Sequence, residues 1–134
     1  GGFSTWATSR VGLAERDVGF YGSAPGNYVQ LTLADTGPAP DLFLVAEAQG
    51  QIIGSVLGGF DGRRGIVYHL AVDHDYRKQG IGRLLMAELE NRLKSKGCLR
   101  CYLLVTNEND TAMRFYEQSG WESMDLHIYA KDIV

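Results

Sequence analysis

From residue 41 onward, apolar and polar residues follow patterns that predict strands and helices in a definite order. Three apolar runs typical of strands occupy residues 42–48, 52–60 and 66–72. Gly50 and a Gly- and Arg-rich turn at 61–65 separate them, which predicts antiparallel neighbours joined by tight turns. The third run is apolar on both faces except at His69, so we expect it in the middle of the sheet.

The pattern changes to a helical period after residue 80. Leu85, Leu89 and Leu93 recur on one helical face of residues 81–96, and Gly97 fits the left-handed position that ends such a helix. A strand at 101–106, a short helix at 110–119 and a final strand at 126–133 complete the order. Three strands, a helix, a strand, a helix and a strand predict an α/β fold built on a mixed sheet flanked by helices.

The front of the chain gives a weaker pattern. Residues 1–40 contain seven of the seventeen glycines and all three prolines, and only Tyr28, Leu31 and Leu33 suggest one amphipathic element. We therefore expect a helical and loop region at 1–40, followed by the patterned core at 41–134. With 134 residues in total, both parts belong to one domain, 1–134.

Composition and charge exclude several classes of protein. The chain is 45% hydrophobic and 22% charged, which is typical of globular domains. Its net charge of −3 disfavours nucleic acid as a partner. No apolar run approaches the roughly 18 residues of a membrane span. The opening residues Gly-Gly-Phe-Ser-Thr-Trp lack the basic segment and apolar stretch that would indicate a signal peptide. These features predict a cytoplasmic protein with neither a membrane nor a nucleic acid as partner.

The two cysteines form a C-x-x-C pair at Cys98 and Cys101. A zinc site needs two further ligands at similar spacing, and the three histidines supply no such pair, so no metal site is expected. A thioredoxin-like motif would open a helix, whereas here Gly97 ends one. We expect structural or incidental cysteines, reduced as in a cytosolic enzyme.

The candidate chemistry lies between the third strand and the long helix. Backbone amides that enter a helix N-terminus bind anions, and the positive end of the helix dipole strengthens the binding. Gly80 and Gly82 lack a Cβ, so a phosphate can reach these amides, while Arg77, Lys78 and Arg83 add positive charge. This arrangement predicts a cradle for a pyrophosphate.

The spacing excludes two other phosphate-binding motifs. A Rossmann fingerprint needs a third glycine three residues after the second, and Leu85 occupies that position. A Walker A loop ends in Gly-Lys-Ser/Thr, which Gly82-Arg83-Leu84 does not match.

Two segments of the chain resemble signatures of the GNAT family of N-acetyltransferases. Arg77-Lys78-Gln79-Gly80-Ile81-Gly82 is similar to that family's Arg/Gln-x-x-Gly-x-Gly/Ala motif. The segment at 109–121 resembles its second signature, an Asn and an Ala followed by Tyr-Glu-x-x-Gly-aromatic. The resemblance covers about residues 41–134 and implies a mostly antiparallel sheet whose central strand splays from its neighbour.

The resemblance also implies roles for individual residues. The splayed strand, at Leu70, Ala71 and Val72, would bind the pantetheine arm of acetyl-CoA and polarise its thioester. Asn109 matches a side chain that contacts the cofactor, and Tyr116 matches the acid that protonates the departing thiolate. The pyrophosphate cradle comprises Arg77, Lys78, Gln79, Gly80, Ile81, Gly82 and Arg83.

The general base is less well defined by the sequence. Ribosomal-type N-terminal acetyltransferases, which this chain resembles in the second signature, carry a base glutamate where Leu104 stands here. His69 has a suitable intrinsic pKa and is our candidate. The alternatives are an ordered water and the carboxylates of Asp73, Glu108 and Glu47.

The function predicted from the sequence is acetyl-CoA-dependent transfer of an acetyl group to an amine of a small molecule or a protein. An alternative is a non-catalytic acyl-CoA-binding or regulatory module, and Tyr116 separates the two because only turnover needs an acid. A nucleic-acid or protein interaction domain that uses the basic rim is a third reading, which the acidic total disfavours. Association into a homodimer stays open.

Overall fold

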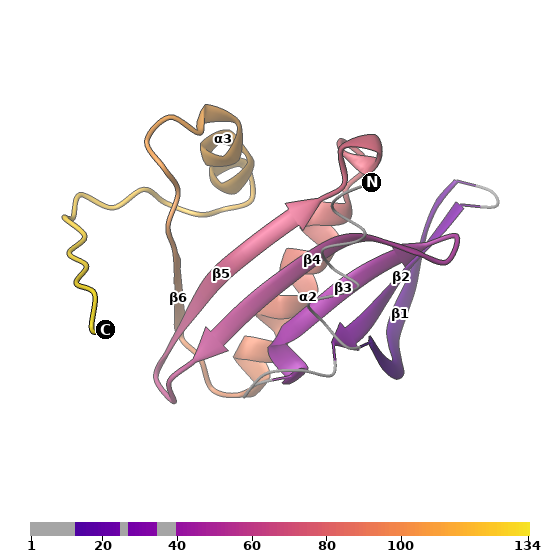
Figure 1. The fold of residues 1–134 in the computed structure, drawn as a ribbon, viewed down its shortest axis with the longest axis horizontal. Helices are drawn as coiled ribbons and strands as arrows, with labels where there is room; N and C mark the ends of the chain where they lie inside the picture. Colours follow the sequence, from indigo (N-terminus) through magenta and orange to yellow (C-terminus); the bar gives the residue numbers. More distant parts are fainter. Residues whose placement is uncertain (1–12, 25–26, 35–39) are drawn as a thin grey trace. The chain divides into compact units, whose positions relative to one another are not determined.

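A computed structural model describes residues 13–24, 27–34 and 40–134. In these residues, six strands form one sheet in the order β1-β2-β3-β4-β5-β6 (Figure 1). The strands are β1 (Leu13–Ala24), β2 (Asn27–Ala34), β3 (Phe43–Ala48), β4 (Gln51–Phe60), β5 (Arg64–Val72) and β6 (Arg100–Leu103). The helices are α2 (Ile81–Ser95) and α3 (Asp110–Gln118), with short 3-10 turns η1 (Pro40–Leu42) and η2 (His74–Tyr76).

The chain divides into two compact units. The first runs to Leu104 and holds the sheet and α2, and the second, Val105–Val134, holds α3. None of the helices in the described ranges is long and apolar enough to cross a membrane.

The sheet is mixed, as the sequence predicts. β1 to β5 pair antiparallel in chain order, and β6 joins β5 in parallel. The parallel ladder runs only from Arg64 opposite Arg100 to Val67 opposite Leu103. β6 ends at Leu103 rather than at residue 106, where its ladder with β5 stops opposite Val67. β5 continues to Val72 paired on one side only, which confirms the expected splayed strand.

The helical and loop prediction for residues 1–40 is wrong for the parts that the structure describes. Residues 13–24 and 27–34 form the antiparallel hairpin β1–β2, while the rest of this region lies outside the described residues. In β2, Val29, Leu31 and Leu33 are all buried. Their spacing of two is the period of a strand, and it outweighs the weak helical reading.

The final strand predicted at 126–133 is also absent from the structure. Residues 121–134 carry no regular secondary structure, and Leu126, Ile128 and Ile133 are exposed. Their sequence has an apolar content suited to a strand. A strand forms only where a second backbone supplies hydrogen bonds, and no ladder reaches this segment in the described residues.

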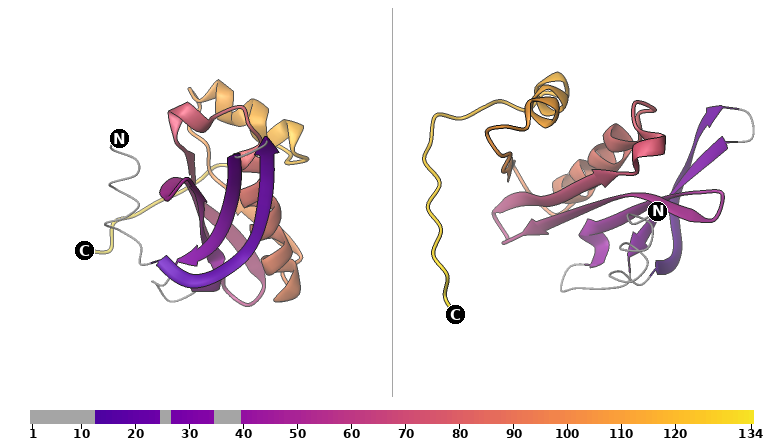
Figure 2. Two further views of the ribbon diagram at one scale, coloured as in Figure 1. Left: turned by 90° about the vertical axis from the view of Figure 1, so that its right-hand side faces the viewer. Right: turned by 45° about the horizontal axis from the view of Figure 1, so that its top comes forward.

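α2 packs along one face of the sheet, against β3, β4 and β5 (Figure 2). Its buried stripe includes Ile81, Leu85 and Leu89, which confirms the helical period predicted for 81–96. Glycines on β4 bring the helix close: a methyl group placed on Gly58 would lie 2.7 Å from Leu89 Cδ1. The close contact at Gly58 therefore fixes the distance between α2 and the sheet. The N-terminus of α2 follows the loop that leaves the end of β5.

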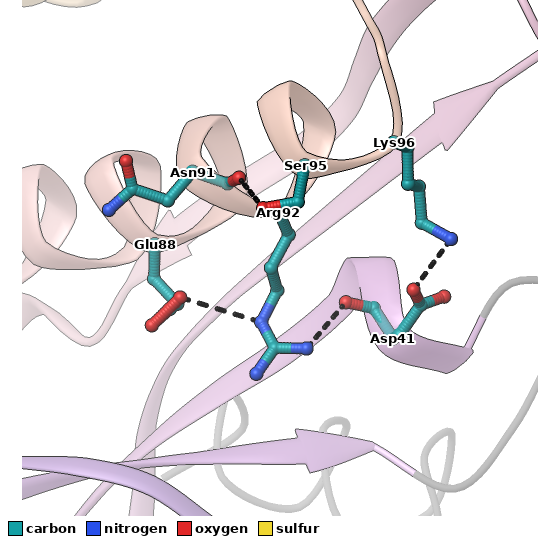
Figure 3. A network of polar contacts seen from close by, with 6 residues as sticks. All are labelled: Asp41, Glu88, Asn91, Arg92, Ser95 and Lys96. Atoms are coloured by element: carbon teal, nitrogen blue, oxygen red, sulfur yellow. Dashed lines mark hydrogen bonds and ion pairs between the residues drawn. The ribbon is translucent and has the colours of Figure 1, made fainter.

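Polar contacts fix the C-terminal half of α2 to the start of β3 (Figure 3). Lys96 Nζ lies 2.7 Å from Asp41 Oδ2, and Arg92 donates a hydrogen bond of 3.4 Å to the Asp41 carbonyl. Arg92 also forms an ion pair of 3.5 Å with Glu88. Asp41 belongs to η1, so these contacts link the helix to the turn that leads into the sheet.

Candidate active site

β5 contains a bulge just before its unpaired edge. Leu57 lies opposite His69, but the next residue of β4, Gly58, lies opposite Val67, so Tyr68 is the extra residue. Such a bulge bends and twists the strand that carries it. Beyond it, Leu70, Ala71 and Val72 pair with β4 alone. The outward amides and carbonyls of this stretch face a side where β6 has already ended.

The loop after β5 is held by short-range hydrogen bonds. The Asp73 amide donates to the Ile53 carbonyl at 2.7 Å, and the Asp73 carboxylate accepts from the Asp75 amide at 3.0 Å. Arg77 Nε donates to the Val72 carbonyl at 3.2 Å. Arg77 thus ties the loop back to the strand. Its guanidinium is engaged with the strand, whereas the sequence predicts its charge on the phosphate rim.

The loop enters α2 through two left-handed residues. Lys78 has φ 63° and Gly80, the N-cap of α2, has φ 82°. No side chain in the described ranges caps the helix, and its first backbone hydrogen bond is donated by the Leu84 amide to the Gly80 carbonyl. The amides of residues 81–83 therefore have no partner within the helix. With no acidic residue in the first turn, this end of α2 is suited to bind an anion.

The bulge places Tyr68 and His69 on the same face of the sheet, away from α2. His69 lies opposite Leu57, and a methyl group placed on Gly59 would lie 2.7 Å from Tyr68 Cε2. The tyrosine ring therefore rests over a glycine and is 66% exposed. Sequence reasoning missed Tyr68, because strict alternation puts it on the face opposite to His69 and no sequence signal marks the bulge.

His69 is half-buried, and burial lowers the pKa of its imidazole below the ordinary 6.5. The neutral form therefore predominates at neutral pH, which is the form that accepts a proton. The other base candidates differ in their surroundings. The Asp73 carboxylate is engaged as a cap, Glu47 lies in β3, and Glu108 is exposed beyond β6.

Asn109 and Tyr116 lie in the second unit. Asn109 is the N-cap of α3, and its Oδ1 accepts from the Ala112 amide at 3.1 Å. The Tyr116 ring packs edge-to-face with Phe115 and with Trp121, at centroid distances of 5.2 and 6.0 Å. Burial raises the pKa of the Tyr116 phenol above 10.0, so it holds its proton at neutral pH.

The structure thus brings the cradle and the β5 edge together in the first unit, while Asn109 and Tyr116 belong to the second. Leu104, where the resemblance to ribosomal-type N-terminal acetyltransferases implies a base glutamate, is exposed just after β6. Among the residues that the structure describes, no three His, Cys, Asp or Glu side chains gather where they could hold a metal ion.

Comparison with known families shows which family the chain belongs to. The model of the acetyltransferase (GNAT) family matches residues 12–121, most of the chain and both units. The chain belongs to the GNAT family of acetyltransferases. An acetyltransferase of Pectobacterium atrosepticum is 43% identical over 95 residues, 71% of this chain and 67% of that protein. One from Sodalis glossinidius is 45% identical over 86 residues, 64% of this chain and 61% of that protein.

Solved structures agree with this membership. Ard1 from Thermoplasma volcanium is 29% identical with a TM-score of 0.58, over 60% of this chain and 55% of that one. The PaiA N-acetyltransferase of Thermoplasma acidophilum, solved with coenzyme A, is 29% identical with a TM-score of 0.59, over 64% and 54%. The matched region thus spans about half to two thirds of these relatives. The predicted family and fold are confirmed.

Proposed function

We propose that this GNAT protein binds acetyl-CoA between the β5 edge and the N-terminus of α2 and transfers its acetyl group to a primary amine. The observation that carries the proposal is the left-handed pair Lys78 and Gly80. These residues open α2 beside a strand edge that pairs with no other strand among the described residues. Backbone amides at a helix N-terminus bind an anion, and the edge of a strand binds an extended chain that carries amide groups. Together they suit a ligand in which a pyrophosphate is joined to such a chain.

Each part of the cofactor has a matching part of the chain. The amides of residues 81–83 would bind the pyrophosphate, with Lys78 and Arg83 exposed beside them to balance its charge. The peptide-like groups of the pantetheine arm would hydrogen-bond with the outer edge of Leu70–Val72, as an added strand does. Asn109 uses Oδ1 for its cap, and its Nδ2 hydrogens suit a carbonyl of the cofactor.

The chemistry requires a nucleophile, an oxyanion site, an acid and a base. The neutral amine attacks the thioester carbonyl carbon, and an amide of the β5 edge stabilises the oxyanion that develops. The carbon–sulfur bond then breaks, and the Tyr116 phenol gives its proton to the departing thiolate. The proton lost by the amine goes to a base, so that the products are an acetamide and coenzyme A with its free thiol.

His69 is the base that we favour. It lies one residue before the proposed oxyanion amides, and its lowered pKa keeps it neutral and able to accept a proton. Its face of the sheet is the one opposite α2, so an acceptor that reaches it would meet Tyr68 beside it. An ordered water near His69 is the alternative proton carrier.

The acceptor is proposed as a primary amine of a small molecule or a protein. The exposed ring of Tyr68 offers a flat aromatic surface for the acceptor, and such a ring attracts a cationic group. Naa50 of Arabidopsis thaliana, 25% identical with a TM-score of 0.58, is solved with a bisubstrate analogue that joins CoA to a peptide, which supports a peptide amine. Leu104 stands where the resemblance implies a glutamate base in ribosomal-type N-terminal acetyltransferases. Proton transfer from the amine to a glutamate at that position is therefore disfavoured in this chain.

The experiment is an acceptor screen with the full chain. The protein is incubated with acetyl-CoA and a library of amines, free thiol is followed, and each active amine is checked for an added acetyl group by mass. We expect at least one amine to be acetylated well above the rate without protein. Binding of acetyl-CoA without turnover on any amine would favour the non-catalytic module, and absence of binding would overturn the cradle itself.

A further inference from the structure

The sulfurs of the two cysteines converge on one glycine of β5, outside the proposed acetyl-transfer site. A methyl group placed on Gly65 would lie 3.0 Å from Cys98 Sγ and 3.2 Å from Cys101 Sγ. Two atoms this near one point are at most about 6 Å apart, so the two sulfurs must approach each other to reach the S–S distance of a disulfide. The missing Cβ of Gly65 is what leaves room for both sulfurs.

The backbone holds the pair from two sides. The Cys98 amide donates to the Leu93 carbonyl at 3.0 Å, which fixes Cys98 to the end of α2. Cys101 lies in β6 directly opposite Gly65 in the parallel ladder. Between them, Leu99 is 96% exposed, so this short connection can adjust without disturbing the core. Both cysteines are free thiols in the structure.

Cys101 is expected to be a poor nucleophile at neutral pH. Burial and the charge of Cys98 raise the pKa of the Cys101 thiol to about 11. Cys101 is therefore almost fully protonated at neutral pH, and the thiolate is the nucleophile in disulfide exchange. Cys98 is the partner expected to react first, and Cys101 is held close by to react second.

We propose that Cys98 and Cys101 form a reversible redox site, in which a small-molecule disulfide such as oxidised glutathione converts the two thiols into an intramolecular disulfide. The Cys98 thiolate attacks one sulfur of the small disulfide, which gives a mixed disulfide and releases one thiol. The Cys101 thiol then loses its proton and attacks Cys98 Sγ. The Cys98–Cys101 bond forms and the second small thiol leaves, so two protein thiols are oxidised and one disulfide is reduced.

The test is a reaction of the full chain with oxidised glutathione, followed by intact-mass analysis after free thiols are blocked. A chelator keeps metal ions from linking the thiols. The wild type is expected to lose the mass of two hydrogens and to retain no blockable thiol. Cys101→Ser is expected to keep a glutathionyl group, because the resolving thiol is gone. Cys98→Ser is expected to react much more slowly than the wild type.

Gly65→Ala tests the geometry separately from the chemistry. Its added methyl group would enter the space of both sulfurs, so the mixed disulfide should form at Cys98 while closure to the intramolecular disulfide slows. A wild type that accumulates glutathionyl groups without closing, or that does not react, would overturn the proposal. Equal reaction rates of Cys98→Ser and the wild type would overturn the assignment of Cys98 as the first nucleophile.

Discussion

Lys78 adopts a left-handed conformation, with φ 63°, two residues before Gly80 does the same. Gly80 accepts this conformation without strain, whereas a residue with a Cβ pays about 1–2 kcal/mol for it. Strained residues of this kind persist where the surrounding structure holds them, and they cluster at ligand sites. Here the Asp73 cap and the bond from Arg77 to Val72 hold the loop. The strain at Lys78 is thus consistent with a loop shaped for a ligand.

At the same scale, Tyr116→Phe tests the proposed acid. The substitution removes only the phenolic hydroxyl and keeps the edge-to-face contacts with Phe115 and Trp121. We expect kcat to fall about tenfold or more, with little change in acetyl-CoA affinity, because the thiolate would leave without its proton donor. Steady-state kinetics with an acceptor from the screen measure both quantities.

Tyr129→Phe is the matched control, because Tyr129 belongs to the same unit and is 91% exposed. It should leave kcat unchanged. A Tyr116→Phe variant with the kcat of the wild type would remove Tyr116 from the mechanism.

His69 makes stability depend on pH. Its pKa is lowered in the folded protein and near 6.5 in the unfolded chain, so the unfolded chain binds more protons between these values. The contribution of His69 to the free energy of unfolding is therefore fully present above pH 6.5. It is lost as the pH falls from there through the pKa that His69 has in the folded protein. We expect the Tm of the wild type to drop more between about pH 7.5 and 5.5 than that of His69→Gln, measured by thermal unfolding.

His127→Gln, at an exposed histidine in the second unit, serves as the control and should keep the pH slope of the wild type. Identical slopes for the wild type and His69→Gln would contradict the lowered pKa.

At the scale of elements, two adjacent glycines of β4 serve opposite faces of the sheet. A methyl group on Gly58 would lie 2.7 Å from Leu89 of α2, and one on Gly59 would lie 2.7 Å from the Tyr68 ring. The same distance has different consequences, because Leu89 is fully buried whereas the Tyr68 side chain is mostly exposed and can move.

Gly58→Ala is therefore expected to lower the free energy of unfolding by about 1–3 kcal/mol, because the added methyl group overpacks the contact between β4 and α2. Gly59→Ala should change it by less than about 0.5 kcal/mol, since the Tyr68 ring can shift aside. Urea unfolding of both variants measures the difference. Equal losses would mean that the two faces of β4 are equally constrained.

The sequence predicts those elements whose hydrophobic period agrees with their burial. The stripe of α2 and the apolar runs of β3 to β5 follow from local pattern. The sequence does not predict the β1–β2 hairpin, because glycines and prolines interrupt the apolar pattern of residues 1–40. The predicted strand at 126–133 does not form, because an apolar run becomes a strand only where a second backbone pairs with it. The bulge at Tyr68 depends on pairing between β4 and β5, which no single segment encodes.

The candidate site divides in the same way. The motif around Gly80 and Gly82 marks the cradle in the sequence, because helix start and glycine spacing are local features. The bond from Arg77 to the strand and the position of Tyr68 beside His69 are set by the packed loop and the bulge, so they required the structure.

At the scale of the whole molecule, the residues of the proposed reaction come from both compact units. The family match runs from residue 12 to residue 121 and so crosses the division after Leu104. The proposed cradle and the β5 edge lie in the first unit, and the proposed acid, Tyr116, and the proposed cofactor contact, Asn109, lie in the second. The protein carries a net charge of −3, yet the cradle presents Lys78 and Arg83, so its attraction for an anion is local.

The most direct test of the cradle is a calorimetric titration of acetyl-CoA into the wild type, Gly82→Val and Ala87→Val. Gly82 is the second residue of α2 and does not have a positive φ, so valine fits the backbone there while its side chain would enter the proposed phosphate position. Ala87→Val adds a comparable side chain at an exposed position further along the same helix. We expect binding by the wild type and Ala87→Val, and a loss of about tenfold or more, ~1.4 kcal/mol, for Gly82→Val. Equal affinity of all three proteins would contradict the cradle.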